Sequence, residues 1–211
     1  MSATVSNNTN QRGSYAGCLV RLAGHDFMDY RVGGTGGAAN HGGSDGCINF
    51  ADADNTGLSS CITEFNVNTD YQNHCTTISL ADYIVIQAEA VMGIAATGYS
   101  ETNKYASGGL LQRFRDTFKF GRTTETNCSW NTGLMPNPVL GCLGLGEIFL
   151  KHIYSGQSNP WALTAAISGA HTLGSATIAN SGFDGFWSDS GAQGQFNNDY
   201  YKSMIAKGWT T

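Results

Sequence analysis

A mainly α-helical fold is predicted by three features of the 211-residue sequence. Apolar residues recur at helical spacing in several segments, strand-like alternation is scarce, and 41% of the residues are hydrophobic, which is enough for a sizeable core. Glycine clusters mark loops between the helical segments. We therefore expect one globular domain over residues 1–211, with a flexible arm at residues 1–13.

The helices are expected in the following order. The first covers residues 15–30, where "LVRLAGHDFMDY" places Arg21 and His25 four residues apart on one face. After the loop "RVGGTGGAANHGGSDGC", a buried central helix starts behind Ser79, with Asp82 completing a capping pattern. Residues 101–141 are expected to be irregular. Later helices are expected at "LGLGEIFLKHIY", at "NPWALTAAISGAHTLG" with Asn159 as N-cap, and at "NNDYYKSMIAKGW".

Charge and hydropathy exclude two classes of function. The net charge of −5 leaves no basic stripe that could neutralise the phosphates of a nucleic acid. The longest apolar run, "YIVIQAEAVMGIAA", is interrupted by Gln87 and Glu89, so no membrane span is expected. No signal peptide is recognisable at Met1, and we read the sequence as that of a mature chain.

The six cysteines are even in number and form no CxxC pair, which favours three disulfides in a secreted protein over a zinc site. The alternative is six reduced, buried cysteines. Their pairing cannot be read from the sequence. Sequons at Asn7 and Asn127 agree with a secreted glycoprotein. The cysteines are Cys18, Cys47, Cys61, Cys75, Cys128 and Cys142.

Six segments, in order, resemble motifs of the plant, fungal and bacterial haem peroxidases, and they cover roughly residues 15–205. Their style is closest to the ascorbate and cytochrome c peroxidase branch, with a distal loop like that of secreted members. The resemblance implies a haem-peroxidase-like helical fold that is short at its C-terminal end. The segments are "RLAGHDF", "DNTGL", "SLADYIVIQAEAV", "GLMPNP", "SGAHTLGSA" and "SGFDGFWSDSGAQGQFNNDYY".

The resemblance also implies roles for five residues. His25 would move the proton of peroxide, Arg21 would stabilise charge on the leaving oxygen, and Asn55 would hold the tautomer of His25. His171 would bind the iron of haem b, and Trp187 would share the oxidising equivalent. Taken singly, His171 and Trp187 also fit ordinary core positions.

Two cation sites are implied by the same resemblance. Asp26, the Gly43 carbonyl and Asp45 match a distal calcium site, although Cys47 stands where a serine hydroxyl would complete it. Thr172 matches a second, proximal cation site. The other positions of that second site are Ser188, Ser190 and Asn197, the last of which replaces an aspartate.

Two functions follow as expectations. The first is a haem peroxidase that reduces hydrogen peroxide with a small reductant. The alternative is a structural subunit of an extracellular fibre or matrix, homo-oligomeric or filamentous, with haem activity lost or reduced. Gly24, which replaces the family's distal aromatic residue, and the low charged fraction of 13% favour this alternative. The family's proximal aspartate is absent from the sequence, so Asp184, Asp189 or a backbone carbonyl is expected to bond His171 instead.

Overall fold

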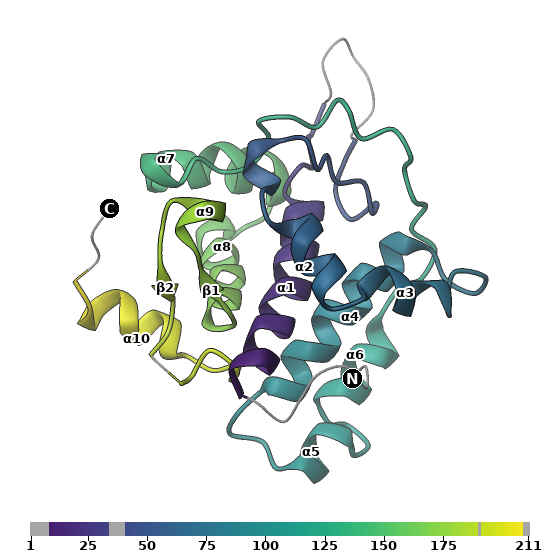
Figure 1. Cartoon of the computed structure of the whole chain (residues 1–211), viewed down its shortest axis with the longest axis vertical. Helices are drawn as coiled ribbons and strands as arrows, with labels where there is room; N and C mark the ends of the chain where they lie inside the picture. The colour runs from purple at the N-terminus through teal and green to yellow at the C-terminus, as the bar shows by residue number, and fades with distance from the viewer. Residues whose placement is uncertain (1–8, 34–40, 190, 209–211) are drawn as a thin grey trace.

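The structure is a computed structural model that describes residues 9–33, 41–189 and 191–208. Its described part is mainly helical, which confirms the predicted fold class (Figure 1). The N-terminal half contains the helices α1 (Thr9–Phe27), η1 (Ala53–Asn55), α2 (Leu58–Glu64), α3 (Val67–Gln72), α4 (Leu80–Ala95), α5 (Glu101–Tyr105) and α6 (Leu110–Thr117). The C-terminal half contains η2 (Pro138–Leu140), α7 (Cys142–Leu145), η3 (Gly146–Ile153), α8 (Pro160–Ser168), η4 (Gly169–Thr172), β1 (Ser175–Ala176), α9 (Ile178–Ser181), β2 (Gly185–Phe186) and α10 (Asp199–Ala206).

Helix α1 begins at Thr9, so the expectation of a flexible arm over residues 1–13 is wrong for residues 9–13; residues 1–8 lie outside the described part. Contact with the C-terminal half explains the early start. The Gln193 amide donates to the Asn10 side chain, and an added Cβ at Gly13 would lie 2.9 Å from the Gln193 carbonyl oxygen.

Helix α4 is capped as the sequence predicts. The Ser79 hydroxyl accepts a hydrogen bond from the Asp82 N–H at 3.0 Å. The Asp82 carboxylate does not complete a capping box; it instead accepts from the Gly121 N–H at 2.8 Å and pairs with Arg122 at 2.9 Å. Asp82 therefore ties α4 to the segment that follows α6.

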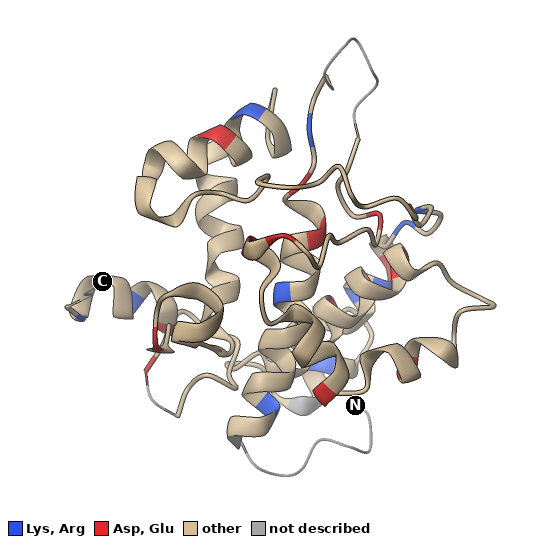
Figure 2. Cartoon of the chain, turned by 45° about the horizontal axis from the view of Figure 1, so that its top comes forward, with Lys and Arg blue, Asp and Glu red and all other residues tan. Residues whose placement is uncertain are grey.

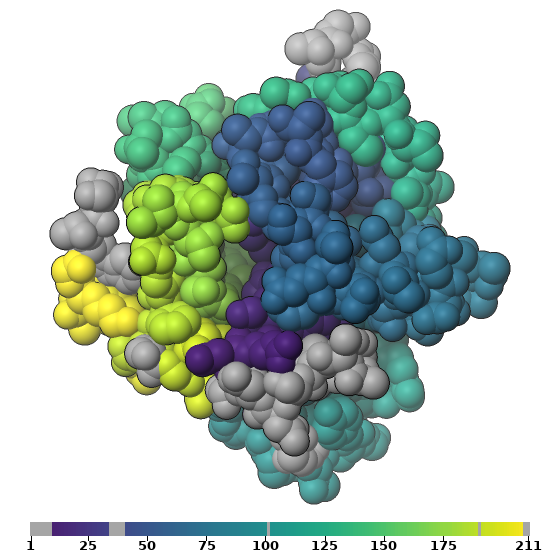
Figure 3. All heavy atoms as spheres, viewed as in Figure 1, coloured from purple at the N-terminus to yellow at the C-terminus, as the bar shows by residue number. Residues whose placement is uncertain are grey.

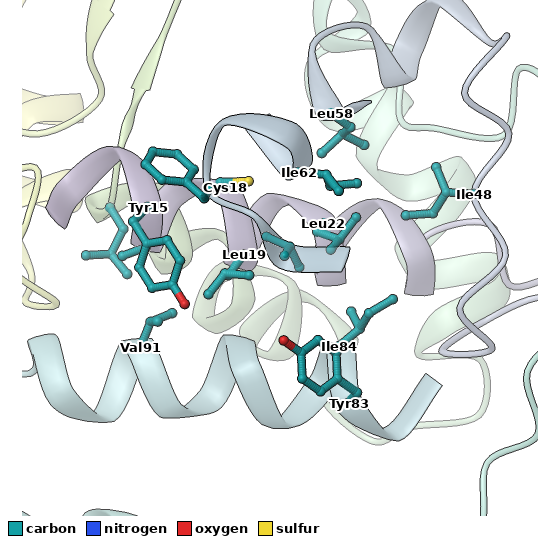
Figure 4. Packing of buried hydrophobic residues seen from close by; sticks show 14 residues of the cluster. Tyr15, Cys18, Leu19, Leu22, Ile48, Leu58, Ile62, Tyr83, Ile84 and Val91 are labelled. Carbon is teal, nitrogen blue, oxygen red and sulfur yellow. The ribbon is translucent and has the colours of Figure 1, made fainter. Parts of the chain in front are cut away.

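The main core lies between α1, α2 and α4 (Figure 4). Leu19 and Leu22 of α1 face Ile84 and Tyr83 of α4, and Leu58 of α2 closes the cluster. These side chains are at most 4% exposed. The core thus fixes one face of α1, while the face carrying Arg21 and His25 is left for other contacts.

Two disulfides are present, Cys18–Cys61 and Cys47–Cys128, whereas Cys75 and Cys142 are exposed free thiols. The expectation of three disulfides within the chain is therefore wrong. Cys142 begins α7 and Cys75 follows α3, and these helices lie at opposite sides of the molecule (Figure 1). A disulfide needs Cα atoms within about 7 Å, so this pair cannot close.

The segment 101–141 is less irregular than expected, because it contains α5, α6 and η2. Helices α2 and α3 were also not foreseen. Each of these helices has at most 8 residues, which is too short to show a helical repeat in the sequence. "LGLGEIFLKHIY" is helical as expected, but it passes from α7 into the π-helix η3.

The two halves meet where backbone packs on backbone. An added Cβ at Gly17 of α1 would lie 2.8 Å from the Gly174 Cα, and Gly174 has a φ of +78°. A side chain at Gly17 would prevent the close approach, and a residue other than glycine at Gly174 would be strained at this positive φ. In Figure 1, α8, β1, β2 and α10 lie on one side of α1, and α2, α3 and α4 lie on the other. Figure 3 shows a hollow between the yellow-green segment around α9 and the blue segment around α2, with α1 at its floor.

Charged side chains are sparse, and both signs are scattered over several elements (Figure 2). The described helices include none that is long and apolar enough to cross a bilayer.

Candidate functional site

Arg21, His25 and Asn55 lie together, as the sequence predicts. The first two are four residues apart on α1, and Asn55 comes from η1. His25 Nδ1 lies 2.8 Å from Asn55 Oδ1. The Asn55 amide is itself oriented, because its Nδ2 donates to the Asn49 carbonyl at 2.9 Å. Asn55 Oδ1 must therefore accept, so Nδ1 of His25 carries the proton and Nε2 is left with its lone pair.

The pKa of His25 is lowered to about 4, chiefly because the ring is taken out of water and secondarily because Arg21 is a nearby cation. The hydrogen bond to Asn55 acts in the opposite direction and raises this pKa. The imidazole is therefore neutral at physiological pH. A neutral imidazole with a free Nε2 can accept a proton.

Arg21 donates to the Asp54 carbonyl at a long 3.4 Å, and none of the described carboxylates forms an ion pair with it. Burial lowers its pKa, but a guanidinium remains charged at any physiological pH. The result is a permanent, half-buried cation beside a neutral base. This pairing suits a reaction in which negative charge develops on an oxygen.

His171 lies in η4, directly after α8. Its Nδ1 donates to the Ser168 carbonyl at 3.0 Å, which settles the expected replacement for the family aspartate in favour of the backbone carbonyl. Leu163 and Ile167 precede His171 at intervals of four residues, so all three share one face. Leu163 is 37% and Ile167 39% exposed, and His171 is also exposed. An apolar stripe thus leads to an accessible imidazole.

Two aromatic rings hold the imidazole of His171. Trp187 meets it edge-on with ring centroids 5.2 Å apart, as the motif order predicts. Tyr200 of α10 stacks on it at 5.3 Å and 28°. The β1–β2 hairpin returns the chain so that Trp187 follows directly on β2. The role of Tyr200 was not foreseen; its segment "NNDYY" is in the resemblance, but stacking depends on how α10 docks.

His25 and His171 come from distant segments, yet His171 lies close enough for its charge to contribute to the lowered pKa of His25. Burial also lowers the pKa of His171, although its ring remains accessible to solvent. A ring can be surrounded by protein and still be wet if it lines a hollow. The opening beside α1 in Figure 3 agrees with this arrangement. Both histidines use Nδ1 for a protein hydrogen bond, so their Nε2 atoms remain for a ligand.

The residues of the predicted calcium site are gathered but already engaged. Asp26 Oδ1 and Asp45 Oδ1 both accept from the Cys47 N–H, at 3.1 and 3.0 Å, and the Gly43 carbonyl accepts from the Asp45 N–H at 2.6 Å. The Cys47 sulfur is locked in a disulfide. Asp26 Oδ2 is buried without a hydrogen-bond partner. Among the described residues no group of three or more His, Cys, Asp or Glu side chains is arranged to hold a metal ion, so calcium here stays a prediction.

The predicted second cation position is filled by protein hydrogen bonds. Thr172 Oγ1 donates to the Asn197 side chain at 3.1 Å, and Ser188 Oγ donates to the Thr172 carbonyl at 3.2 Å. The Lys207 ammonium donates to the Ser188 carbonyl at 2.8 Å. Ser190 lies outside the described residues. This network ties the segment carrying Trp187 to η4, and a cation at Thr172 stays a prediction.

The donor set fits a haem iron. Imidazole nitrogen is a common axial ligand of haem, and Nε2 of His171 has no partner among the described residues. The neighbouring exposed apolar side chains of Leu163 and Ile167 offer a surface on which a flat apolar macrocycle can lie. At Gly24, an added Cβ would contact only the Met28 side chain, at 3.8 Å, so space is left on the His25 side.

No protein-family model matches the sequence. Individual proteins, however, do match it. The chain is 28% identical over 196 residues to "Probable L-ascorbate peroxidase 3, peroxisomal" of Oryza sativa subsp. japonica, which covers 91% of this chain and 56% of that protein. It is 27% identical over 199 residues to "Probable L-ascorbate peroxidase 4, peroxisomal" of the same plant, covering 91% and 57%.

A shorter match, 31% identical over 78 residues, links the chain to the "Putative heme-binding peroxidase" of Gibberella zeae and covers 37% of this chain and 22% of that protein. The chain spans little more than half the length of the ascorbate peroxidases it matches. These matches agree with the order of motifs and with the helical architecture. The chain is a distant homologue of ascorbate peroxidases and heme-binding peroxidases, within the haem peroxidase superfamily.

Proposed function

We propose that the protein is a haem peroxidase that reduces hydrogen peroxide at the expense of a small reductant. The observation that carries this proposal is the pair His25 and His171: the charge of His171 acts on the pKa of His25, both Nδ1 atoms are engaged and both Nε2 atoms are available. The distant relationship to named peroxidases supports it. The whole reaction takes two electrons from the reductant and two protons, and it converts one peroxide into two waters.

In this proposal His171 holds haem b through Nε2, while Trp187 and Tyr200 fix the plane of its ring. The haem supplies the redox centre that peroxide oxidises. Its histidine partner donates Nδ1–H to a backbone carbonyl, which is a weaker acceptor than a carboxylate. We therefore expect the His171 imidazole to be less basic than a histidine bonded to a carboxylate would be. Trp187, in contact with the His171 ring, would share the oxidising equivalent.

His25 and Arg21 perform the proton chemistry. Nε2 of His25 accepts the proton from one peroxide oxygen and returns it to the other, which leaves as water. Arg21 stabilises the negative charge that develops on the leaving oxygen. Asn55 keeps Nδ1 protonated, and thus keeps Nε2 in the form that can accept. Each step uses a group whose protonation state is fixed by its surroundings.

The test is to add haem to the purified protein, mix with hydrogen peroxide and follow the Soret band by stopped flow. We expect a second-order shift of the band, with a rate constant that is level near neutral pH and falls as the pH drops through about 4, where His25 becomes protonated. Far-UV circular dichroism at each pH excludes unfolding as the cause. Failure to bind haem, or a Soret band that peroxide leaves unchanged, would contradict the proposal.

The surface around α7 supports the alternative role in an assembly. Val139, Leu140 and Leu143 are 76%, 52% and 75% exposed, and the free thiol of Cys142 lies among them. An apolar patch with an exposed thiol is suited to contact with another molecule. Light scattering coupled to size exclusion, with and without a reductant, would reveal oligomers; a monomer under both conditions would remove this role.

Secretion is part of the proposal. The disulfides Cys18–Cys61 and Cys47–Cys128 need an oxidising compartment to persist. Asn127, the sequon residue that falls within the described part, is exposed and thus open to glycosylation. A glycosidase-sensitive mass shift of the native protein is the expected result.

A further inference from the structure

A second cavity lies away from the two histidines, where α1, α2, α3 and α4 meet the loop that follows Gly46. Its volume is about 210 Å³. Leu22, Ile62 and Ile84 come from three of these helices, line the cavity and point toward one another (Figure 4). Phe50, which is 51% exposed, belongs to its wall and remains accessible. None of the residues assigned to the proposed peroxidase chemistry lines it.

Both disulfides brace the walls of this cavity. Cys18–Cys61 joins α1 to α2, and Cys61 lies next to the lining residue Ile62. Cys47–Cys128 anchors the loop wall, since Cys47 is flanked by the lining residues Gly46 and Ile48. A cavity braced in this way exists before a ligand arrives. Binding therefore does not have to meet the cost of ordering the walls.

The lining determines the chemistry of an occupant. Aliphatic side chains are the largest group in the lining, and Tyr71 and Tyr83, whose ring centroids lie 5.1 Å apart, add aromatic surface. Their hydroxyls are already used: Tyr83 donates to Asp70 at 2.7 Å and Tyr71 to the Ile78 carbonyl at 3.4 Å. Flat aromatic molecules pack well against such rings.

The charge and the volume of the cavity restrict the class of ligand further. Neither lysine nor arginine lines the cavity, and the Asp70 carboxylate behind Tyr83 disfavours an anion. Ser59 and Asn68 are exposed lining residues whose side chains can bond a single polar substituent. A cavity of about 150 Å³ lined by aliphatic and aromatic side chains is known to hold benzene. The available volume therefore suits one or two fused rings.

We propose that this cavity is a binding site for a small, uncharged aromatic compound with one hydrogen-bonding substituent, such as a phenol or an indole. The ring lies against Tyr71, Tyr83 and the aliphatic wall, and the polar substituent points to Ser59 and Asn68. The site does not depend on haem, so it stands or falls separately from the peroxidase proposal.

The test is calorimetric titration of the haem-free full chain with indole and p-cresol, together with NMR of its methyl groups. We expect saturable binding, with the methyl shifts concentrated on Leu22, Ile48, Ile62 and Ile84. Benzoate, which carries a negative charge, and cyclohexanol, which is not flat, should bind more weakly than p-cresol. Equal binding of cyclohexanol or benzoate would overturn the assigned ligand class.

Matched variants on α2 locate the site. Ser59→Trp places a ring in the cavity and should weaken indole binding about tenfold or more, because the ligand loses apolar contact area. Ser60→Trp, the neighbouring exposed residue outside the lining, should bind as wild type does. Asn68→Trp serves as a second filling variant if Ser59→Trp does not fold. Unchanged affinity in a folded filling variant, or shifts confined to methyl groups elsewhere, would overturn the proposal.

Discussion

The two candidate histidines are held in place by different means. His25 lies on α1, a helix of 19 residues that packs into the main core and is tied to α2 by the Cys18–Cys61 disulfide. His171 lies in the four-residue turn η4 and is positioned by one carbonyl and two aromatic rings. Neither disulfide includes a residue beyond Cys128, so neither is attached to η4 or to the elements around it.

This difference has a physical consequence for function. Proton transfer needs a base held to within a fraction of an ångström, and a covalently braced helix provides that. In the proposed role, His171 would only have to present its Nε2 to the iron, and metal binding generally orders the segment that carries the ligand. If the proposed haem binds, we therefore expect the elements around His25 to be ordered already and the elements around His171 to become more ordered.

The largest effect is expected from replacing the two residues of α1 that are proposed to act on peroxide. His25→Leu removes the base and Arg21→Leu removes the cation, so each should slow the reaction with peroxide by about 10²- to 10⁴-fold while haem stays bound. His74→Leu, at an exposed histidine, is the control and should react like wild type. The measurement is the stopped-flow rate of the three variants with peroxide. A wild-type rate in His25→Leu or Arg21→Leu would remove that residue from the mechanism.

Removing the brace tests the comparison through stability. The double variant Cys18→Ala/Cys61→Ala opens a link across 43 residues and should lower the free energy of unfolding by about 3 kcal/mol. The matched control Cys75→Ala/Cys142→Ala removes the two exposed free thiols and should change it by less than about 0.5 kcal/mol. Urea unfolding measures both, and similar losses in the two variants would show that the disulfide does not brace α1.

A pair of glycine variants tests the contact between the halves. Gly17→Ala forces a methyl group within 2.8 Å of the Gly174 backbone and should cost about 1–3 kcal/mol, with weaker haem binding because the halves are pushed apart. Gly24→Ala has room, with its nearest neighbour at 3.8 Å, and should be neutral or more stable by up to about 1 kcal/mol through helix propensity. The same sign of change in both variants would contradict this packing.

The last prediction concerns Asp26, which follows His25 on α1. Burial, with Asp45 and Asp29 nearby, raises the pKa of its carboxyl from 3.8 to about 8. The native state therefore holds a proton that the unfolded chain has lost between these values, and its stability falls as the pH rises through this window, by at most about 1.4 kcal/mol per pH unit.

Asp26→Asn should flatten that decline, measured as the free energy of unfolding at pH 5, 6, 7 and 8. Repeating the measurement with added calcium also tests the predicted calcium site. If Asp26 and Asp45 bind the ion, calcium should stabilise wild type at pH 8 and leave the Asn variant unaffected. A wild-type stability that does not fall between pH 5 and 8 in calcium-free buffer would show that Asp26 is ionised in the native state.

The sequence predicts those parts of the site that depend on local spacing. Arg21 and His25 share a face because they are four residues apart, and Ser79 caps α4 because its hydroxyl meets the N–H three residues on. Asn55 and Trp187 were predicted because the segments that contain them resemble motifs of the family and occur in the same order. The parts that depend on docking were missed: the start of α1 rests on contact with Gln193, and the stacking of Tyr200 rests on where α10 lies.

The hydrogen-bond partner of His171 and the number of disulfides show the same limit. The sequence left Asp184, Asp189 and a backbone carbonyl open as acceptors, because every residue carries a carbonyl and only the turn after α8 selects Ser168. An even number of cysteines suggested complete pairing, but Cys75 and Cys142 are carried to opposite sides by their elements. Composition cannot supply such distances.

The most direct test of the division of labour is a haem titration of wild type, His171→Ala and His25→Leu, followed by the Soret band. The account predicts that wild type and His25→Leu bind haem with similar affinity, and that His171→Ala fails to retain it through a column that wild type survives. Equal retention by His171→Ala, or loss of haem in His25→Leu alone, would show that the iron is not held by the C-terminal half and would contradict the account.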